Sequence, residues 1–171
     1  MELLELVTNL REVLDVDTLD DLPDKLLELS LSGNDAAIDD IVKAVGGDLT
    51  VDFLQAVYQY YAADRKGLKQ DFTPKSIGRL VSAMIGDADT VVDMCAGSGA
   101  LTIQRHNSKG GEFACYEYDE KVISYLLFNL LVRNIPATVY QGDVLTGEEQ
   151  PRYRVEGGEK YGRVVDLQSA V

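Results

Sequence analysis

The chain has few of the residues that build metal centres or disulfide frameworks. Its 171 residues include no tryptophan, one histidine and two cysteines. Cys95 and Cys115 lie in separate predicted elements without Cys-x-x-Cys spacing, which excludes a zinc motif and a disulfide framework. His106 has no second ligand or nucleophile at a characteristic spacing. We therefore expect no metal, and we expect small buried cysteine side chains in a reducing compartment.

Long apolar segments are also missing. No apolar run approaches the roughly 20 residues that cross a bilayer as a helix, and the N-terminus lacks the basic-then-apolar pattern of a signal peptide. We expect a cytoplasmic protein without membrane contact. Hydrophobic residues at 46% and charged residues at 26% are ordinary for a globular chain, either one medium domain or a small helical domain joined to part of another.

Basic side chains are scarce, with 16 Lys and Arg against 29 Asp and Glu and a formal net charge of -13. Binding of DNA or RNA phosphates depends on Lys and Arg, so this chain alone is poorly suited to it. The acid is concentrated in residues 1–66, which hold 15 acidic and 5 basic side chains. We predict that residues 1–66 are a distinct acidic module and that residues 67–171 form a second part.

The acidic module has the periodicity of a small helical bundle. Apolar residues at helical spacing predict helices over residues 2–14, 23–31, 36–45 and 53–65, followed by a linker at 67–70. Tyr58, Tyr60 and Tyr61 form a stripe on the last helix that is capable of stacking on bases. At helical spacing such a stripe is more typical of core and interface packing.

The segment Thr90-Val91-Val92-Asp93-Met94-Cys95-Ala96-Gly97-Ser98-Gly99 has the pattern of a ligand-binding corner. Its β-branched run predicts a buried strand, which leads through a glycine turn into a helix that begins at Ala100. Such a corner brings backbone and helix N–H groups close to a ligand. Gly-x-Gly-x-x-Gly is absent, and no Gly-Lys-Ser/Thr follows. The acidic lead residue Asp93 favours a ligand with a cationic amino group and no pyrophosphate.

The elements around this corner alternate between helix and strand. A helix over 75–85, begun by a capping Thr73 and by Pro74 at its first position, precedes the strand of the corner. Further strands are predicted at 112–117 and 137–141, with a helix over 119–133 between them. This order indicates a parallel sheet with crossover helices.

Acidic residues follow each of the three predicted parallel strands. Asp93, Glu117 and Asp143 all fall at carboxyl ends of strands, where ligands of such sheets bind, so we expect a shared ligand site. From about residue 148 the pattern changes to two short strands around Gly157-Gly158, which predicts a hairpin-like segment. Its arginines are expected on a solvated face rather than on nucleic acid.

Five motifs together resemble one protein family. They are Phe72-Thr73-Pro74, Asp93-Met94-Cys95-Ala96-Gly97-Ser98-Gly99-Ala100-Leu101, Glu117-Tyr118-Asp119, Asn129-Leu130 and Gly142-Asp143-Val144-Leu145. In order and spacing they resemble N6-adenine DNA methylases of the type I restriction-modification M-subunit kind, which use S-adenosylmethionine and have a helical N-terminal domain. The resemblance covers residues 70–146 well and the acidic helices loosely. It implies an α/β fold with a partial Rossmann-like (class I methyltransferase) parallel sheet.

The resemblance also implies which residues hold the methionine end of S-adenosylmethionine. Phe72 and Thr73 would border that end. Asp93 and the turn formed by Ala96, Gly97, Ser98 and Gly99 would hold the zwitterion, with its carboxylate near N–H groups and its ammonium near acidic oxygens.

The nucleoside end of the cofactor is assigned in the same way. Glu117 would accept the two ribose hydroxyls, a task suited to a carboxylate. Asp143 would bind the exocyclic amine of adenine, with Val144 and Tyr118 as apolar walls.

One motif of the family is missing. Its catalytic signature, Asn/Asp-Pro-Pro followed by an aromatic residue, binds the flipped-out adenine and is expected after Asp143. The four prolines are Pro23, Pro74, Pro136 and Pro151, so no Pro-Pro occurs and no catalytic residue is assigned. We expect a truncated, S-adenosylmethionine-binding portion of an adenine-specific DNA methyltransferase that transfers no methyl group alone. DNA, in a complete methylase, and a specificity or partner subunit are the expected partners.

Other functions fit part of the pattern. A small-molecule or RNA methyltransferase shares Asp-x-x-x-Gly-x-Gly, although Phe-Thr-Pro and the helical module favour the DNA family. A non-catalytic binding or regulatory protein, acting on a partner subunit through acidic helices or mimicking DNA charge, fits the net charge and the missing motif. A different nucleotide-binding α/β domain is disfavoured, because no phosphate-binding pattern is present.

Overall fold

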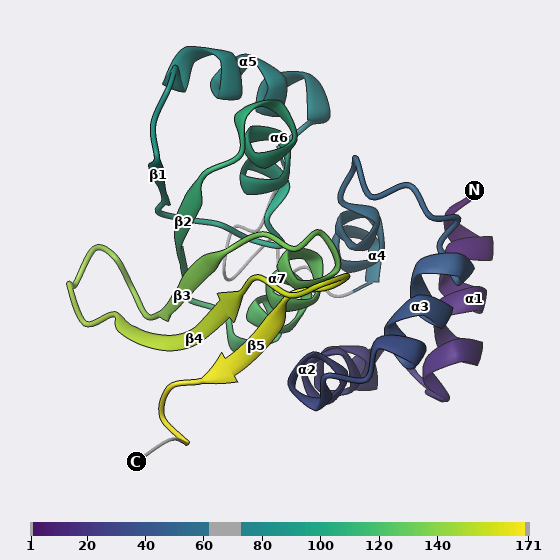
Figure 1. The fold of residues 1–171 in the computed structure, drawn as a ribbon. Coiled ribbons are helices and arrows are strands. Elements are labelled where there is room, and N and C mark those ends of the chain that lie inside the picture. The colour runs from purple at the N-terminus through teal and green to yellow at the C-terminus, as the bar shows by residue number, and fades with distance from the viewer. Residues whose placement is uncertain (1, 62–72, 170–171) are drawn as a thin grey trace.

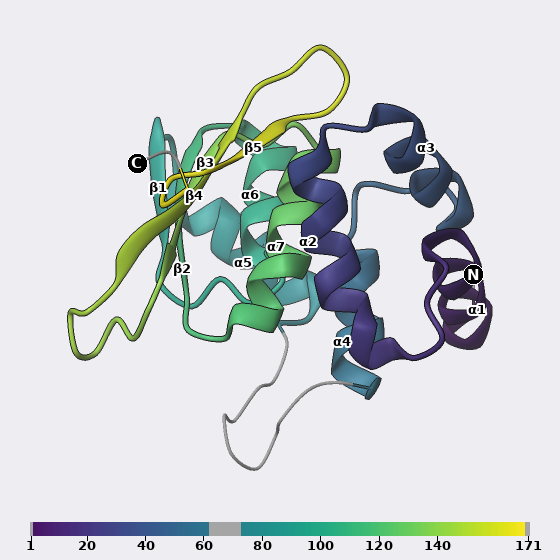
Figure 2. The ribbon, with the colours of Figure 1, turned by 90° about the horizontal axis from the view of Figure 1, so that it is seen from below.

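The computed structural model describes residues 2–61 and 73–169, which form three layers (Figures 1 and 2). A five-stranded sheet is the first layer, and helices α6 (Ala100–Lys109) and α7 (Glu120–Val132) cover one of its faces. The N-terminal helices form the third layer, against α7. The predicted α/β class with a helical N-terminal part is confirmed. The predicted linker at 67–70, the module boundary at residue 66 and Phe72 lie outside the described residues.

The sheet contains three parallel strands and an antiparallel hairpin. β1 (Thr90–Asp93) pairs with β2 (Glu112–Glu117), which pairs with β3 (Ala137–Gln141), all parallel. β4 (Gln150–Glu156) runs antiparallel to β3, and β5 (Arg163–Asp166) antiparallel to β4. The strands lie in sequence order, so β1 is an edge strand. The predicted strand–helix–strand–helix–strand pattern and the C-terminal hairpin are both confirmed.

Helix α7 is the centre of the molecule. All residues from Val122 to Val132 are buried, and a helix that is apolar all round belongs between two other layers. Leu126, Leu127 and Leu130 pack into the core beneath the sheet, whereas Tyr125 and Phe128 pack with the N-terminal helices. The helix therefore packs on two sides, and Val122 and Leu131 also belong to the core that it shares with the N-terminal helices.

The N-terminal helices bury one continuous apolar core against α7. They are α1 (Leu3–Leu14), α2 (Leu22–Ser32), α3 (Asp35–Ala44) and α4 (Phe53–Tyr61), with a 3-10 turn at Leu19–Asp21. Leu10, Leu26, Ile41 and Val57 are fully buried there in one cluster with α7. Because the core is shared, the helices are held by packing on α7 and not only by each other. The division into two modules stays a prediction.

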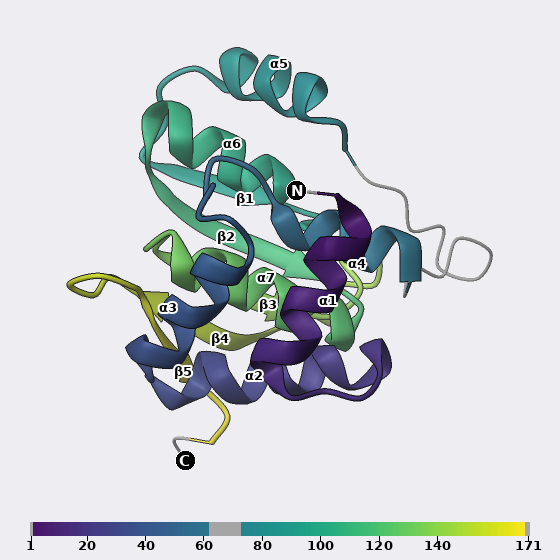
Figure 3. The ribbon, with the colours of Figure 1, turned by 90° about the vertical axis from the view of Figure 1, so that its right-hand side faces the viewer.

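Helix α5 (Lys75–Ile85) lies beside α6 at the β1 end of the sheet (Figure 3). The predicted cap by Thr73 is wrong: Pro74 is in the N-cap position with extended backbone, and no side chain caps the helix. The Thr73 carbonyl instead accepts a hydrogen bond from Gln55 Nε2 at 3.3 Å. Thr73 is thereby linked to α4.

The sheet face opposite α6 and α7 carries no helix among the described residues (Figure 2). Tyr116 and Tyr140 stack on that face, with ring centroids 4.5 Å apart and planes inclined by 8°. The hairpin arginines form ion pairs: Arg152 with Asp166, Arg154 with Glu112, and Arg163 with Asp35. All three side chains are partly exposed, and their expected place away from nucleic acid stays a prediction.

Candidate ligand-binding site

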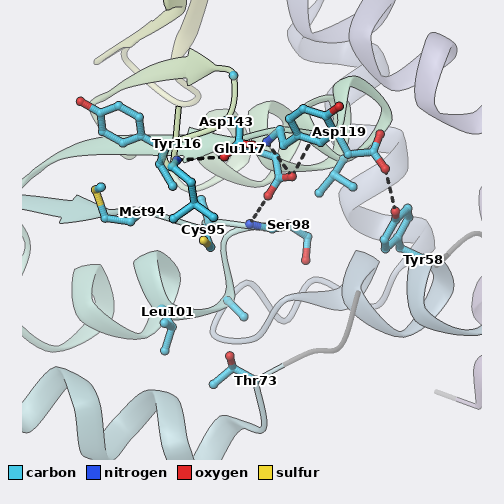
Figure 4. A pocket seen from close by; sticks show the side chains of 18 residues that line it. Tyr58, Thr73, Met94, Cys95, Ser98, Leu101, Tyr116, Glu117, Asp119 and Asp143 are labelled. Atoms are coloured by element: carbon cyan, nitrogen blue, oxygen red, sulfur yellow. Dashed lines mark hydrogen bonds between the residues drawn. The ribbon is translucent and has the colours of Figure 1, made fainter. Parts of the chain in front are cut away.

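A cavity of about 430 Å³ lies at the carboxyl ends of β1, β2 and β3. Its volume is in the range of pockets that bind small molecules. Figure 4 shows side chains from the glycine turn, the β2 end, the β3 loop and α4 pointing into it. Eight predicted site residues line it: Thr73, Ala96, Gly97, Ser98, Glu117, Tyr118, Asp143 and Val144. Asp93 and Gly99 do not line it, and Phe72 is outside the described residues.

The glycine turn is fixed by backbone hydrogen bonds. Ala96 N–H donates to the Tyr116 carbonyl at 2.9 Å, and Gly99 N–H donates to the Ala96 carbonyl at 2.9 Å. Gly97 and Gly99 both have positive φ, 56° and 97°, which favours glycine. A Cβ on Gly97 would meet no atom within 4 Å, so the space beside the Gly97 backbone is open to a ligand.

Helix α6 begins directly after this turn. No side chain caps its N-terminus, and its first residues, Ala100 and Leu101, line the cavity. The first N–H groups of a helix lack partners within the helix and carry a partial positive charge. An anionic group of a ligand would be stabilised at this position.

The Glu117 carboxylate is bound by three backbone N–H groups. Oε2 accepts from Gly97 at 2.9 Å, and Oε1 accepts from Tyr118 and Asp119 at 2.9 Å each. Burial raises the pKa of Glu117 more than these hydrogen bonds lower it, and nearby Asp119 raises it further. A carboxylate has about four lone-pair positions. To accept two hydroxyls of a ligand, Glu117 would have to release at least one of these N–H groups.

Asp93 lies behind the glycine turn and not at the cavity surface. Thr102 Oγ1 donates to Asp93 Oδ2 at 2.9 Å, which ties the end of β1 to α6. Burial raises the pKa of Asp93, while the Thr102 hydroxyl and the Cys95 N–H lower it. Asp93 lines a separate cavity of about 90 Å³ between α5, β1 and α6. Its observed contacts support the turn, and direct binding of a ligand stays a prediction.

Asp143 lies on the loop after β3, across the cavity from the turn (Figure 4). Gly142 N–H donates to the Glu117 carbonyl at 3.1 Å, which joins this loop to the end of β2. Asp143 Oδ1 accepts from Leu145 N–H at 2.9 Å. Glycine is required at 142, because a Cβ there would lie 2.5 Å from the Glu149 Cα.

The charges around the cavity favour a cation. Glu117, Asp119 and Asp143 line it, and none of the described lining residues is Lys, Arg or His. The same negative charges affect Cys95. Burial and the charges of Glu117, Asp93 and Asp143 all raise the pKa of its thiol. The cavity thus combines an acidic wall with one helix N-terminus, as a zwitterionic ligand requires.

A family model described as N-6 DNA methylase matches residues 47–157. The chain belongs to the N-6 DNA methylase family. The resemblance inferred from the motifs is thereby confirmed at the level of the family. No curated protein and no solved structure matches the chain. The matched segment begins before α4, so it includes part of the N-terminal helices as well as the cavity.

Several residues at the cavity were not predicted from the sequence. Tyr58 comes from α4, and its hydroxyl donates to Asp119 Oδ2 at 3.3 Å (Figure 4). Tyr58 is 2% exposed and its ring lies 5.1 Å from that of Tyr125, whereas Tyr60 and Tyr61 are exposed. Tyr116 also lines the cavity, from the end of β2. Helical periodicity identified Tyr58 as a packing residue but gave no signal that α4 reaches this edge of the sheet.

Metal-binding clusters and membrane-spanning helices are both absent from the described part of the chain. No group of three or more His, Cys, Asp or Glu side chains in residues 2–61 and 73–169 is arranged to hold a metal ion. Within the same ranges, no helix has the length and apolar character needed to span a membrane.

Proposed function

We propose that this chain is the S-adenosylmethionine-binding portion of an adenine-N6 DNA methyltransferase of a restriction-modification system, and that it transfers no methyl group on its own. The observation that carries the proposal is the acidic cavity at the strand ends, with an uncapped helix N-terminus on one side. Family membership supports methylation of DNA as the reaction of the complete enzyme.

The methionine end of S-adenosylmethionine fits the glycine-turn side of the cavity. Its carboxylate would bind at the N-terminus of α6, beside Ala100 and Leu101. Its ammonium and sulfonium would lie in the negative field of the acidic wall, to which Asp119 contributes a carboxylate. The open space above Gly97 leaves room for close approach of the ligand to the backbone. When bound, the cofactor supplies the electrophilic methyl group.

The nucleoside end fits the opposite side of the cavity. Glu117 would accept the ribose hydroxyls after one of its N–H donors is released. Asp143 would accept from the exocyclic amine of adenine, and Val144 and Tyr118 would contact the ring. Exposure of Tyr118, at 63%, leaves its ring free to lie against a base.

A missing motif supports the proposal that this chain alone transfers no methyl group. No Asn/Asp-Pro-Pro followed by an aromatic residue is present. That motif would bind the target adenine. Target DNA and a specificity or partner subunit are therefore proposed as partners of a complete methylase.

Titration calorimetry with S-adenosylmethionine and with its demethylated product tests binding. We expect saturable heat for one site per chain. Glu117→Gln should weaken binding about 10-fold or more, because a charge-assisted hydrogen bond contributes about 1.5–3 kcal/mol. Glu148→Gln is the matched control, since Glu148 is exposed and does not line the cavity. No heat and no thermal stabilisation with either ligand would refute the proposal.

An assay with labelled methyl donor and adenine-containing DNA tests catalysis. We expect no labelled DNA from the chain alone. Labelled N6-methyladenine in the product would show that the missing proline motif is dispensable, and would overturn the second half of the proposal.

A non-catalytic binding or regulatory role through a partner subunit is the alternative. The net charge of -13 and the missing motif favour it. The gene sequence beyond Val171 distinguishes the two: an Asn-Pro-Pro-aromatic motif in frame a short way downstream favours the methyltransferase, and a stop codon favours the regulatory protein.

A further inference from the structure

The segment that leads into α4 is bound by side chains from both helices beneath the sheet. Arg133, at the C-terminal cap of α7, donates from Nε to the Leu49 carbonyl at 2.8 Å. Its guanidinium lies over the Phe53 ring, 5.4 Å from the centroid. Gln104 and Asn107 of α6 each donate to the Thr50 carbonyl at 3.0 Å. The start of α4 is therefore fixed to the layer that carries the glycine turn.

Asp52, at the centre of this segment, contacts the glycine turn directly. Ser98 Oγ donates to Asp52 Oδ2 at 2.6 Å, and Asn129 Nδ2 donates to Asp52 Oδ1 at 2.8 Å. Asn129 Nδ2 also donates to the Ser98 carbonyl at 2.8 Å. Asp52 Oδ1 additionally accepts from Gln55 N–H at 2.9 Å, in the first turn of α4. One carboxylate thus joins α4, the glycine turn and α7.

The surroundings of this carboxylate are desolvated and polar. Ser98 and Asn129 are 1% and 0% exposed. Burial raises the pKa of Asp52, whereas the Ser98 hydroxyl, the positive charge of Arg133 and the Asn129 amide lower it. Buried hydrogen bonds of this kind hold their partners in one geometry, because an unpaired partner would be left without water.

We infer that Asp52 is a positioning residue for cofactor binding, which acts by holding Ser98 and the glycine turn in the geometry that the cofactor requires. This inference rests on the proposed function. Asp52 does not line the cavity, so it acts through Ser98, which does. It also lies at the start of the helix that supplies Tyr58 to the cavity. The N-terminal helices thereby become part of the binding apparatus.

Calorimetry on the full chain and its variants tests this role. Asp52→Ala should weaken S-adenosylmethionine binding about 10-fold, the factor that corresponds to loss of one charge-assisted hydrogen bond. Asp52→Asn keeps the shape and one acceptor oxygen, so it should restore most of the affinity and bind within about 3-fold of the wild type. Unchanged affinity in Asp52→Ala would overturn the inference.

Asn34→Ala is the control for general destabilisation. The Asn34 side chain accepts from Ala37 N–H at 3.2 Å and caps α3, and it does not line the ligand cavity. It should lower the unfolding temperature without changing affinity at a temperature where the variant is folded. An equal loss of affinity in Asn34→Ala would mean that stability alone sets binding, and would overturn the inference.

A second readout does not depend on the cofactor. Amide hydrogen exchange at Gly97, Ser98 and Gly99 should become faster in Asp52→Ala and stay close to the wild type in Asp52→Asn. If the alanine variant fails to fold, Ser98→Ala removes the same Ser98–Asp52 hydrogen bond and should show the faster exchange. Exchange in the centre of α7 should stay as in the wild type. If wild-type protein binds no S-adenosylmethionine, the proposed function fails, and exchange alone decides whether Asp52 holds the turn. Unchanged exchange at these three amides would overturn that role.

Discussion

The two glycines of the turn should respond very differently to alanine. A Cβ at Gly97 would meet nothing within 4 Å, so Gly97→Ala costs only the strain of a positive φ of 56°. That strain is about 1–2 kcal/mol for a residue other than glycine. At Gly99 the φ is 97° and the Cβ would lie 2.9 Å from Leu126 Cδ1. Leu126 is fully buried, so it has little room to move.

The expected loss at Gly99 is therefore larger. Overpacking of a core adds about 1–3 kcal/mol to the backbone strain, so Gly99→Ala should lower the free energy of unfolding by about 2–5 kcal/mol. Urea unfolding with linear extrapolation measures both variants. Leu126→Val removes the clashing methyl group, and in the double variant the loss should be smaller than the sum of the single losses by at least about 1 kcal/mol.

Ligand binding should follow the opposite order. Gly97 lines the cavity and Gly99 does not. Gly97→Ala should therefore weaken S-adenosylmethionine binding. Its free energy of unfolding should fall by only about 1–2 kcal/mol, from backbone strain. Equal losses of stability at the two positions, or strictly additive effects with Leu126→Val, would refute the geometry of the turn on which this reasoning rests.

Three further predictions concern single side chains. Arg133→Lys loses the paired guanidinium hydrogen bonds to the Leu49 and Val51 carbonyls before α4 and should destabilise the fold by about 2–3 kcal/mol in urea, with Arg79→Lys on an exposed position as control. Burial raises the pKa of Asp93 above its ordinary value of 3.8, so protonated Asp93 stabilises the fold below pH 3.8, and this stability is lost as the pH rises through the raised pKa. Asp93→Asn has no such proton to lose, so its free energy of unfolding should increase relative to that of the wild type as the pH rises through this range. A difference between the two proteins that does not change with pH would contradict this. Burial raises the pKa of Cys115 to about 12, so a thiol reagent at neutral pH should titrate Cys95 alone in native protein and both cysteines in denaturant.

The local elements of the fold were predictable because each carries its own pattern. The β-branched run of β1, the glycine turn and the periodicity of α6 and α7 lie within short stretches of sequence. Three acidic residues after three strands predicted a shared site, and Glu117 and Asp143 do line one cavity. Asp93 lies behind the turn and lines a different cavity, because its side chain points away from the shared site. The spacing of residues in the sequence does not specify this direction.

Contacts between the layers could not be predicted from the sequence. Asp52 and Ser98 are 46 positions apart, and Asp52 and Asn129 are 77 apart. Ser98 and Asn129 were identified as parts of family motifs, but no pattern in the sequence indicated that Asp52 contacts them. The contact of the start of α4 with the glycine turn and with α7 lets one carboxylate join three elements. The cap of α5 failed for a local reason, because extended backbone at Pro74 begins the helix one residue later than the proline rule suggests.

The stacked pair Tyr116–Tyr140 gives the molecule a built-in optical reporter. The chain has nine tyrosines and no tryptophan, so its near-ultraviolet emission comes from phenol rings. Tyr116 lines the cavity, and its ring is 4.5 Å from that of Tyr140. A purine that enters the cavity alters the surroundings of this pair directly. Occupancy is therefore readable from circular dichroism or emission of the unlabelled protein, with Tyr140→Phe retaining the stack and removing one phenol.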